Sequence, residues 1–148
     1  MMLVEHIIDT GRRRLATLGT ESGVCEAAAV LMNPDTPLVV VCDDGGVVVG
    51  VISRADVIKV LASARADSHR ARAGDIMSRR LLTCRARQPL QQVWESLNAR
   101  SLRCVPILDA DGRPLGVLHA RDLASALLEE VTNEELLLRD YVLGIGYQ

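Results

Sequence analysis

"LVVVCDDGGVVVGVISRAD", residues 38–56, sets two apolar runs on either side of a turn and leads into a helical pattern. The runs are rich in valine, and the glycines of "DDGG" permit the positive φ of a tight turn, so the stretch predicts a β-hairpin. Beyond it, Val57, Val60 and Leu61 are spaced as one apolar stripe of a helix. The stretch therefore predicts strand, turn, strand and helix in immediate succession.

The same pattern returns 66 residues later, where residues 104–122 read "CVPILDADGRPLGVLHARD". Without a gap, 13 of the 54 aligned pairs are identical, which identifies an internal repeat of two copies. A short strand is expected to open each copy, at residues 15–18 and 81–84. The chain is therefore expected to contain two β-α-β-β-α motifs related by pseudo-twofold symmetry.

A helix is predicted between the first and second strands of each copy. Its apolar residues recur at intervals of three and four, at Val24, Ala27, Ala28 and Leu31 in the first copy and at Leu90, Val93, Trp94 and Leu97 in the second. "NPDTP" follows the first of these helices, and its prolines should end that helix sooner.

Length and composition limit the possible architectures. The 148 residues are 49% hydrophobic and 24% charged, without phenylalanine, so the core must consist of aliphatic side chains. One copy of about 55 residues buries too little surface to be stable alone. We therefore expect an α+β fold in which the two motifs pack sheet to sheet.

The repeat also suggests the domain organisation. Residues 1–64 are expected to form the first motif, 65–74 a solvated linker, 75–130 the second motif and 131–148 a C-terminal helix or tail. The tail carries an apolar helical patch that includes Tyr141 and Val142. Because such a patch must be covered by its own module or by a second subunit, a homodimer is expected.

Charge and hydropathy exclude several classes of function. A formal net charge of -2 and the lack of aromatic residues among the basic ones argue against nucleic acid as a partner. No apolar run approaches the ~20 residues of a membrane span, and the start is not a secretory signal, which predicts a cytoplasmic protein. Four widely spaced cysteines predict buried thiols and no metal site.

Three stretches together resemble a known family. "DIMSRRLLT", "CVPILDADGRPLGVL" and the doubled position of "GVISRAD" are similar to the tandem CBS-domain pair, also called the Bateman module. The resemblance implies two clefts between the motifs, where members bind AMP, ADP, ATP or S-adenosylmethionine. It also implies that a serine or threonine faces phosphate and that an aspartate binds the ribose hydroxyls.

Ser53 and Asp56 occupy those two positions at the start of a predicted helix. A helix N-terminus favours phosphate, and an ionised carboxylate accepts hydrogen bonds from adjacent hydroxyls. The alternative is structural, because S-x-x-D before a helix is also an imperfect capping box. The second copy has His119, a poor N-cap, yet retains Asp122, which favours ligand contact for Asp56. Arg54 either contacts phosphate or points to solvent.

The other candidates have both functional and structural interpretations. His119 is either a phosphate contact that strengthens on protonation or a surface residue near the cleft mouth. Thr17 and Thr83 either face the cleft or are ordinary strand residues. The apolar candidates for the adenine pocket, whose alternative is the core, are Leu15, Leu81, Val39 and Val105. We expect the two clefts to be unequal, with the Ser53 cleft the tighter.

The leading hypothesis is a stand-alone regulatory module that senses an adenine nucleotide and signals to a separate effector protein or through the homodimer. The alternative is a structural or interaction scaffold with empty clefts. An enzyme is disfavoured, since no base is oriented toward Ser53 and no G-x-x-x-x-G-K-[S/T] loop is present. No cofactor is expected beyond the bound nucleotide.

Overall fold

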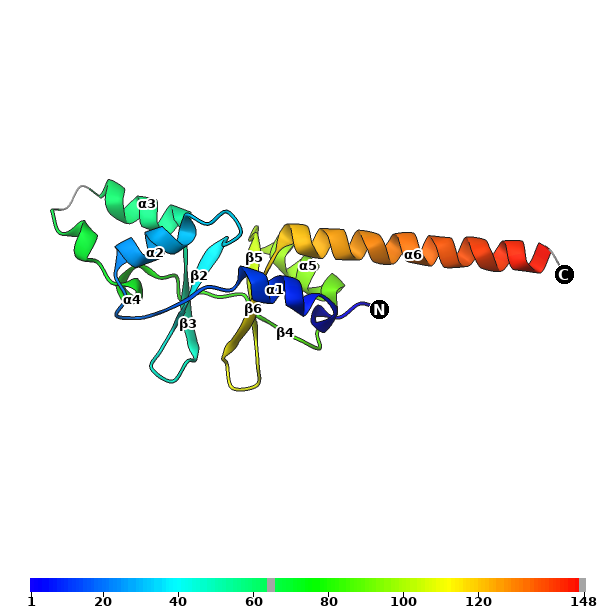
Figure 1. Ribbon diagram of the computed structural model, residues 1–148, viewed down its shortest axis with the longest axis horizontal. Coiled ribbons are helices and arrows are strands. Elements are labelled where there is room, and N and C mark those ends of the chain that lie inside the picture. The colour runs from blue at the N-terminus through cyan, green and yellow to red at the C-terminus, as the bar shows by residue number, and fades with distance from the viewer. Residues whose placement is uncertain (64–65, 147–148) are drawn as a thin grey trace.

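Two three-stranded mixed sheets form the centre of the molecule (Figure 1), as a computed structural model of residues 1–63 and 66–146 shows. The expected α+β fold class is confirmed. The strands are β1 (Thr17–Gly19), β2 (Leu38–Cys42), β3 (Val48–Ser53), β4 (Cys84–Arg85), β5 (Cys104–Leu108) and β6 (Pro114–His119). The helices are η1 (Val4–Ile7), α1 (Ile8–Arg14), α2 (Val24–Leu31), α3 (Arg54–Ala62), η2 (Ser68–Arg70), α4 (Ala73–Ile76), α5 (Leu90–Ala99) and α6 (Ala120–Gly146).

The repeat is preserved in the pairing of the strands. In each sheet the first strand runs parallel to the second, and the second pairs antiparallel with the third. A register shift follows Val41 in the first sheet and Ile107, its counterpart, in the second. The hairpin glycines Gly46 and Gly112 have φ of 82° and 83°, which explains why both turns require glycine.

The two sheets pack against each other through one apolar layer. Alternate residues of β2, including Leu38 and Val40, form one buried cluster with Val117 of the other sheet. The hairpins also touch, because the Val48 N–H donates a 3.0 Å hydrogen bond to the Gly112 carbonyl. The expected sheet-to-sheet arrangement is therefore confirmed.

Each hydrophobic core contains a segment from outside the continuous motif. Val4 is fully buried in the second core, and its N–H donates to the Gln88 carbonyl. Ala73 is fully buried in the first core, and its N–H donates to the Ser22 carbonyl. The expectation that residues 65–74 form a solvated linker is wrong at Ala73, because α4 packs against the first motif. The domain boundaries at 64 and 74 stay a prediction.

The opening strands begin later than expected. β1 begins at Thr17, not Leu15, and β4 begins at Cys84, not Leu81. The residues ahead of β4 have another partner, since Ser78 forms a two-way backbone bridge with Val51. The helix ending at "NPDTP" is shorter than its counterpart, with 8 residues against 10, as the prolines predicted.

The last helix, α6, spans 27 residues and projects far beyond the rest of the molecule (Figure 1). The second helix of the repeat and the tail are thus one continuous element. Among the described helices, none combines the length and apolar character needed to cross a membrane.

A glycine in β6 allows α1 to lie directly on the second sheet. A Cβ at Gly116 would come 2.7 Å from the Gly11 carbonyl carbon, which is backbone and cannot rotate away. A Cβ at Gly50, the counterpart, would meet only the flexible Met77 side chain at 2.5 Å. We expect Gly116→Ala to lower the free energy of unfolding by about 1–3 kcal/mol and Gly50→Ala by clearly less. Urea denaturation of both variants tests this, and equal losses would contradict it.

Candidate functional site

One cleft of about 530 Å³ lies where the two motifs meet. Its volume is within the range of about 300–1,000 Å³ typical of small-molecule sites. The first motif contributes Pro37, Leu38, Val51, Ser53, Arg54, Ala55 and Asp56, and the later residues of the chain contribute Ser78, Arg80, Leu81, Leu82, Leu102, Arg103, Cys104, Pro106 and His119. Polar groups and a broad apolar wall therefore face the same space.

Ser53 and Asp56 form the capping box that starts α3. The Ser53 hydroxyl accepts the Asp56 N–H at 3.3 Å, and Asp56 Oδ2 accepts the Ser53 N–H at 2.8 Å. The structural interpretation of this pair is therefore correct. It does not exclude a ligand, because no hydrogen bond within residues 1–63 and 66–146 engages the second carboxylate oxygen, Oδ1.

His119 and Asp122 form a similar cap at the start of α6. His119 Nδ1 accepts the Arg121 N–H at 3.0 Å, and Asp122 Oδ2 accepts the His119 N–H at 2.8 Å. The expectation that His119 is a poor N-cap is wrong, since a neutral imidazole nitrogen replaces the serine hydroxyl as acceptor. Asp122 thus has a structural reason to be present, and its retention no longer argues for ligand contact.

Asp122 is also held by an arginine of the first motif. Arg14 Nε donates to Asp122 Oδ2 and Arg14 Nη2 donates to Asp122 Oδ1, both at 2.8 Å. The side chains are only 19% and 9% exposed. This bidentate ion pair engages both carboxylate oxygens, and the hydrogen bond to Asp122 raises the pKa of Arg14. The neighbouring pocket, about 270 Å³, is lined by Thr10, Arg13, Arg14 and Asp35 and lacks Asp122.

Arg80 is the counterpart of Arg14 in the repeat, and it behaves differently. It is exposed and lines the 530 Å³ cleft that also contains Asp56. In the part of the chain that the structure describes, Arg80 forms no ion pair with a carboxylate. The site at Asp122 is therefore closed by Arg14, whereas the pseudo-equivalent site at Asp56 is open and has Arg80 at its edge.

Arg54 has a structural role although it borders the cleft. Its guanidinium donates to the carbonyl oxygens of Leu31, Asn33 and Thr36 at 2.9, 3.0 and 2.9 Å. These bonds tie the start of α3 to the loop after α2. The solvent-pointing alternative is wrong, and a phosphate contact would compete with these carbonyls.

The remaining candidates are divided between the cleft and the rest of the protein. Leu81 lines the cleft together with His119, so His119 shares the space of Ser53 and does not form a separate cleft. Leu15 packs at the sheet interface, Thr17 is exposed in β1, and Thr83 is half-buried outside the cleft lining.

Val105 is fully buried in the second core, so the expectation that it lines an adenine pocket is wrong. Val39 is fully buried in the first core, so the same correction applies to Val39. Their side chains point to the helix-covered face of each sheet. On β5 the alternate residues, Cys104 and Pro106, line the cleft. The period-two alternation of a strand would have identified them. Burial raises the pKa of the Cys104 thiol to about 11, so it is not a nucleophile at neutral pH.

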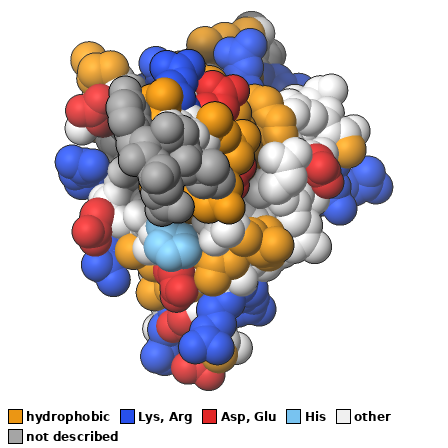
Figure 2. All heavy atoms as spheres, turned by 90° about the vertical axis from the view of Figure 1, so that its right-hand side faces the viewer, with side chains coloured by type: hydrophobic (Ala, Val, Ile, Leu, Met, Phe, Trp, Pro, Cys, Tyr) orange, Lys and Arg blue, Asp and Glu red, His pale blue; other side chains and the backbone are white. Residues whose placement is uncertain are grey.

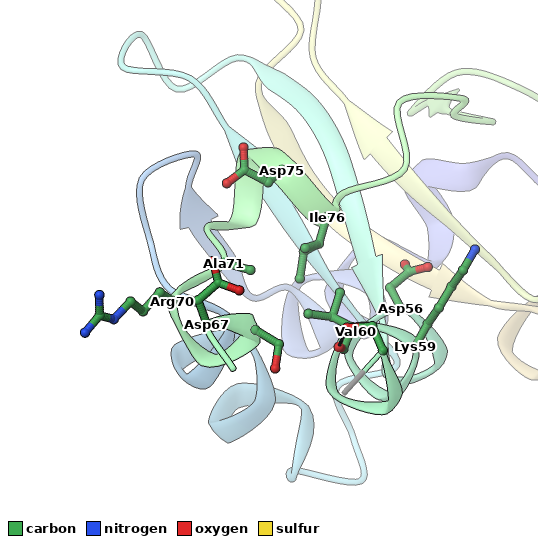
Figure 3. Close-up of a pocket in the computed structure, with 10 residues that line it drawn as sticks. Asp56, Lys59, Val60, Asp67, Arg70, Ala71, Asp75 and Ile76 are labelled. Carbon is green, nitrogen blue, oxygen red and sulfur yellow. Dashed lines mark hydrogen bonds between the residues drawn. The ribbon is translucent and has the colours of Figure 1, made fainter. Parts of the chain in front are cut away.

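A second cleft, about 610 Å³, lies between α3 and the segment of η2 and α4 (Figure 3). Figure 3 shows the side chain of Arg70 pointing away from it. The described carboxylates do not gather as a metal site. Strands of both sheets line the 530 Å³ cleft, whereas no strand residue lines this one, so the 530 Å³ cleft is the stronger candidate.

His119 is expected to make stability depend on pH. Burial, with the positive charges of Arg121 and Arg14, lowers its pKa from the usual value of 6.5. The folded state thus favours neutral imidazole, and this contribution is present above pH 6.5 and lost as the pH falls toward the lowered pKa. The melting temperature should fall between pH 7 and 5 more in the wild type than in His119→Asn. Identical pH profiles would contradict this. Because its pKa is lowered, a phosphate contact that strengthens when His119 is protonated would do so at lower pH than for an ordinary histidine.

Comparisons with known proteins agree with this geometry. The CBS domain family matches residues 4–63 and 73–129. The chain belongs to this family. A solved structure of CBSX2 in complex with AMP is 25% identical, has a TM-score of 0.75 and covers 87% of this chain and 98% of that one.

Two further proteins illustrate the range of similar proteins. The CBS domain pair of protein MJ0100, solved with 5′-methylthioadenosine and S-adenosyl-L-methionine, is 22% identical with a TM-score of 0.73, over 88% of this chain and 98% of that one. A homoserine O-acetyltransferase from Methanohalobium evestigatum is 24% identical over 84% of this chain but only 24% of its own length. The chain thus spans about a quarter or less of the curated relatives it matches.

Proposed function

We propose that this CBS-domain pair is a regulatory module that binds an adenosine nucleotide of the AMP class in the 530 Å³ cleft. The observation that carries the proposal is the contrast between the two pseudo-equivalent sites. Asp56 has an oxygen without a hydrogen bond among the described residues and shares its cleft with Arg80. Asp122 is engaged on both oxygens by Arg14. One nucleotide per chain follows from this contrast.

The groups around the cleft suit the three parts of a nucleotide. Asp56 Oδ1 would accept hydrogen bonds from the ribose hydroxyls, each worth about 1.5–3 kcal/mol to a charged acceptor. Phosphate would lie between the N-terminus of α3 and the Arg80 guanidinium, which together supply N–H donors and positive charge. The adenine ring would pack on apolar lining residues such as Leu81 and Pro106.

Regulation follows from the position of the cleft. Its walls come from both motifs, so a ligand that contacts both favours one arrangement of the motifs over others. The effector would be a separate protein, a further part of a longer chain or a second copy. The relation to AMP-bound CBSX2 at 25% identity supports the choice of ligand class.

A thermal shift panel of adenosine, AMP, ADP, ATP and S-adenosylmethionine tests the proposal. A ligand at a hundredfold excess over its dissociation constant stabilises by about 2.7 kcal/mol, so the best one should raise the melting temperature by roughly 5–10 °C. Arg80→Ala should reduce the shift with AMP but not with adenosine. Arg79→Ala, the adjacent control outside the cleft lining, should keep both shifts. No shift with any ligand at millimolar concentration would favour the scaffold alternative.

A further inference from the structure

The distal part of α6 carries a large exposed apolar surface. Figure 1 shows this helix extending away from both sheets, and Figure 2, viewed from its far end, shows hydrophobic side chains beside it. The exposed large hydrophobic residues of the helix are Leu128, Val131, Leu136, Leu137, Leu138, Tyr141, Val142 and Leu143. An isolated helix of this kind is marginal in water, so a packing partner would stabilise it.

A subset of these residues has the spacing of a coiled-coil seam. Leu128, Val131, Leu138 and Val142, together with Glu135, recur at alternating intervals of four and three. This is the spacing of the core positions of a heptad repeat. The four apolar members are 67%, 51%, 65% and 60% exposed, so the seam is unpaired in one copy of the chain.

Glu135 decides which orientation a second helix can take. In a parallel pair of identical helices, Glu135 would face Glu135 of the second copy, placing two carboxylates together in the seam. In an antiparallel pair with Val131 opposite Val142, the same register sets Glu135 opposite Leu138. Arg139 of the second copy then lies one residue from that contact, so its guanidinium is within reach of the Glu135 carboxylate.

A groove beside the first half of α6 could accommodate the C-terminal part of α6 from the second copy. A groove of about 360 Å³ lies between α6 and the N-terminus, lined by Met1, Met2, Gln91, Leu127, Glu130, Val131 and Glu134. Because Val131 belongs to both the groove and the seam, the antiparallel register brings Val142 of the second copy to the edge of this groove.

We infer that α6 pairs with α6 of a second copy as an antiparallel two-helix coiled coil, and that this contact makes the protein a homodimer. The interface is isologous, with two symmetric Glu135–Arg139 ion pairs flanking the axis. A competing surface is present at the C-terminal end of α2 and on α3, where Met32, the residue after α2, and Ile58 are 83% and 64% exposed. The two surfaces are far apart along the molecule, so variants distinguish them (Figure 1).

Light scattering of the purified chain, with variants in each surface, tests the inference. The wild type should have twice the 16.1 kDa mass of one chain at micromolar concentration. Leu138→Lys should weaken dimerisation by about 100-fold or more, since each dimer loses two buried leucines. Ile58→Lys, the control, should stay dimeric. A monomeric wild type, or a dimer that Ile58→Lys breaks and Leu138→Lys does not, would overturn the inference.

Engineered disulfides test the orientation. In a Cys25→Ser background, which removes the exposed native thiol, we mix a Val131→Cys chain with a Val142→Cys chain. Antiparallel helices bring these two positions within disulfide range, so cross-linked heterodimers should form on oxidation. A parallel pair would instead cross-link each variant to itself and would overturn the proposed register. Circular dichroism of Leu138→Lys should show a folded protein with an unchanged melting transition of the sheets.

Discussion

Asp56→Ala is expected to weaken AMP binding by about tenfold or more, because one hydrogen bond to a charged acceptor is worth ~1.5–3 kcal/mol. Asp56 is the acidic residue among those that line the open cleft. The substitution also removes the acceptor of the Ser53 N–H, so a stability loss of about 1 kcal/mol should accompany it. Titration calorimetry below the melting range separates the two effects.

The matched control is Asp122→Ala, the same change at the counterpart position. Arg14 already engages both oxygens of Asp122, so the AMP dissociation constant should change by less than about twofold. If Asp122→Ala abolished binding and Asp56→Ala left it intact, the nucleotide would occupy the other site.

Asp122→Ala should instead cause a larger loss of stability than Asp56→Ala. Breaking a buried ion pair costs about 3–5 kcal/mol, mainly because one charge stays behind without a partner. Arg14 is 19% exposed and can recover some hydration, so we expect about 2–3 kcal/mol from the ion pair and the lost helix cap together. Urea denaturation followed by circular dichroism measures the free energy of unfolding.

The outcome that would contradict this account is a loss no larger than that of Asp56→Ala. Arg14→Ala offers a second test, since it removes the same ion pair but leaves the cap between Asp122 and the His119 N–H. Because it leaves the Asp122 carboxylate, which is only 9% exposed, without its ion-pair partner, it should also lower the free energy of unfolding by about 2–3 kcal/mol.

The hairpins and the repeat were predictable because they depend on local chemistry. Glycine at Gly46 and Gly112 specifies the turns, and short apolar runs specify the strands on either side. The helices α2 and α5 follow from apolar spacing. The sequence also located the open cleft through Ser53 and Asp56, since both lie at a strand-to-helix junction that the pattern marks clearly.

The closed site was not predictable in the same way. Arg14 and Asp122 are 108 residues apart, and nothing local indicates that this pair forms while Arg80 and Asp56 stay apart. The burial of Val4 and Ala73 likewise depends on how segments outside the motifs pack on the sheets. Val105 was misassigned because both faces of its sheet are buried, one under helices and the other against the first sheet. The sequence does not show which of these two faces a residue of β5 occupies.

The most direct test of the account is a crystal structure of the protein grown with AMP. We predict electron density for one nucleotide per chain in the 530 Å³ cleft, with ribose hydroxyls on Asp56 and phosphate near Arg80. The Arg14–Asp122 ion pair should be intact in the same crystal. Density for AMP at Asp122, with Arg14 displaced and the Asp56 cleft empty, would contradict the central claim.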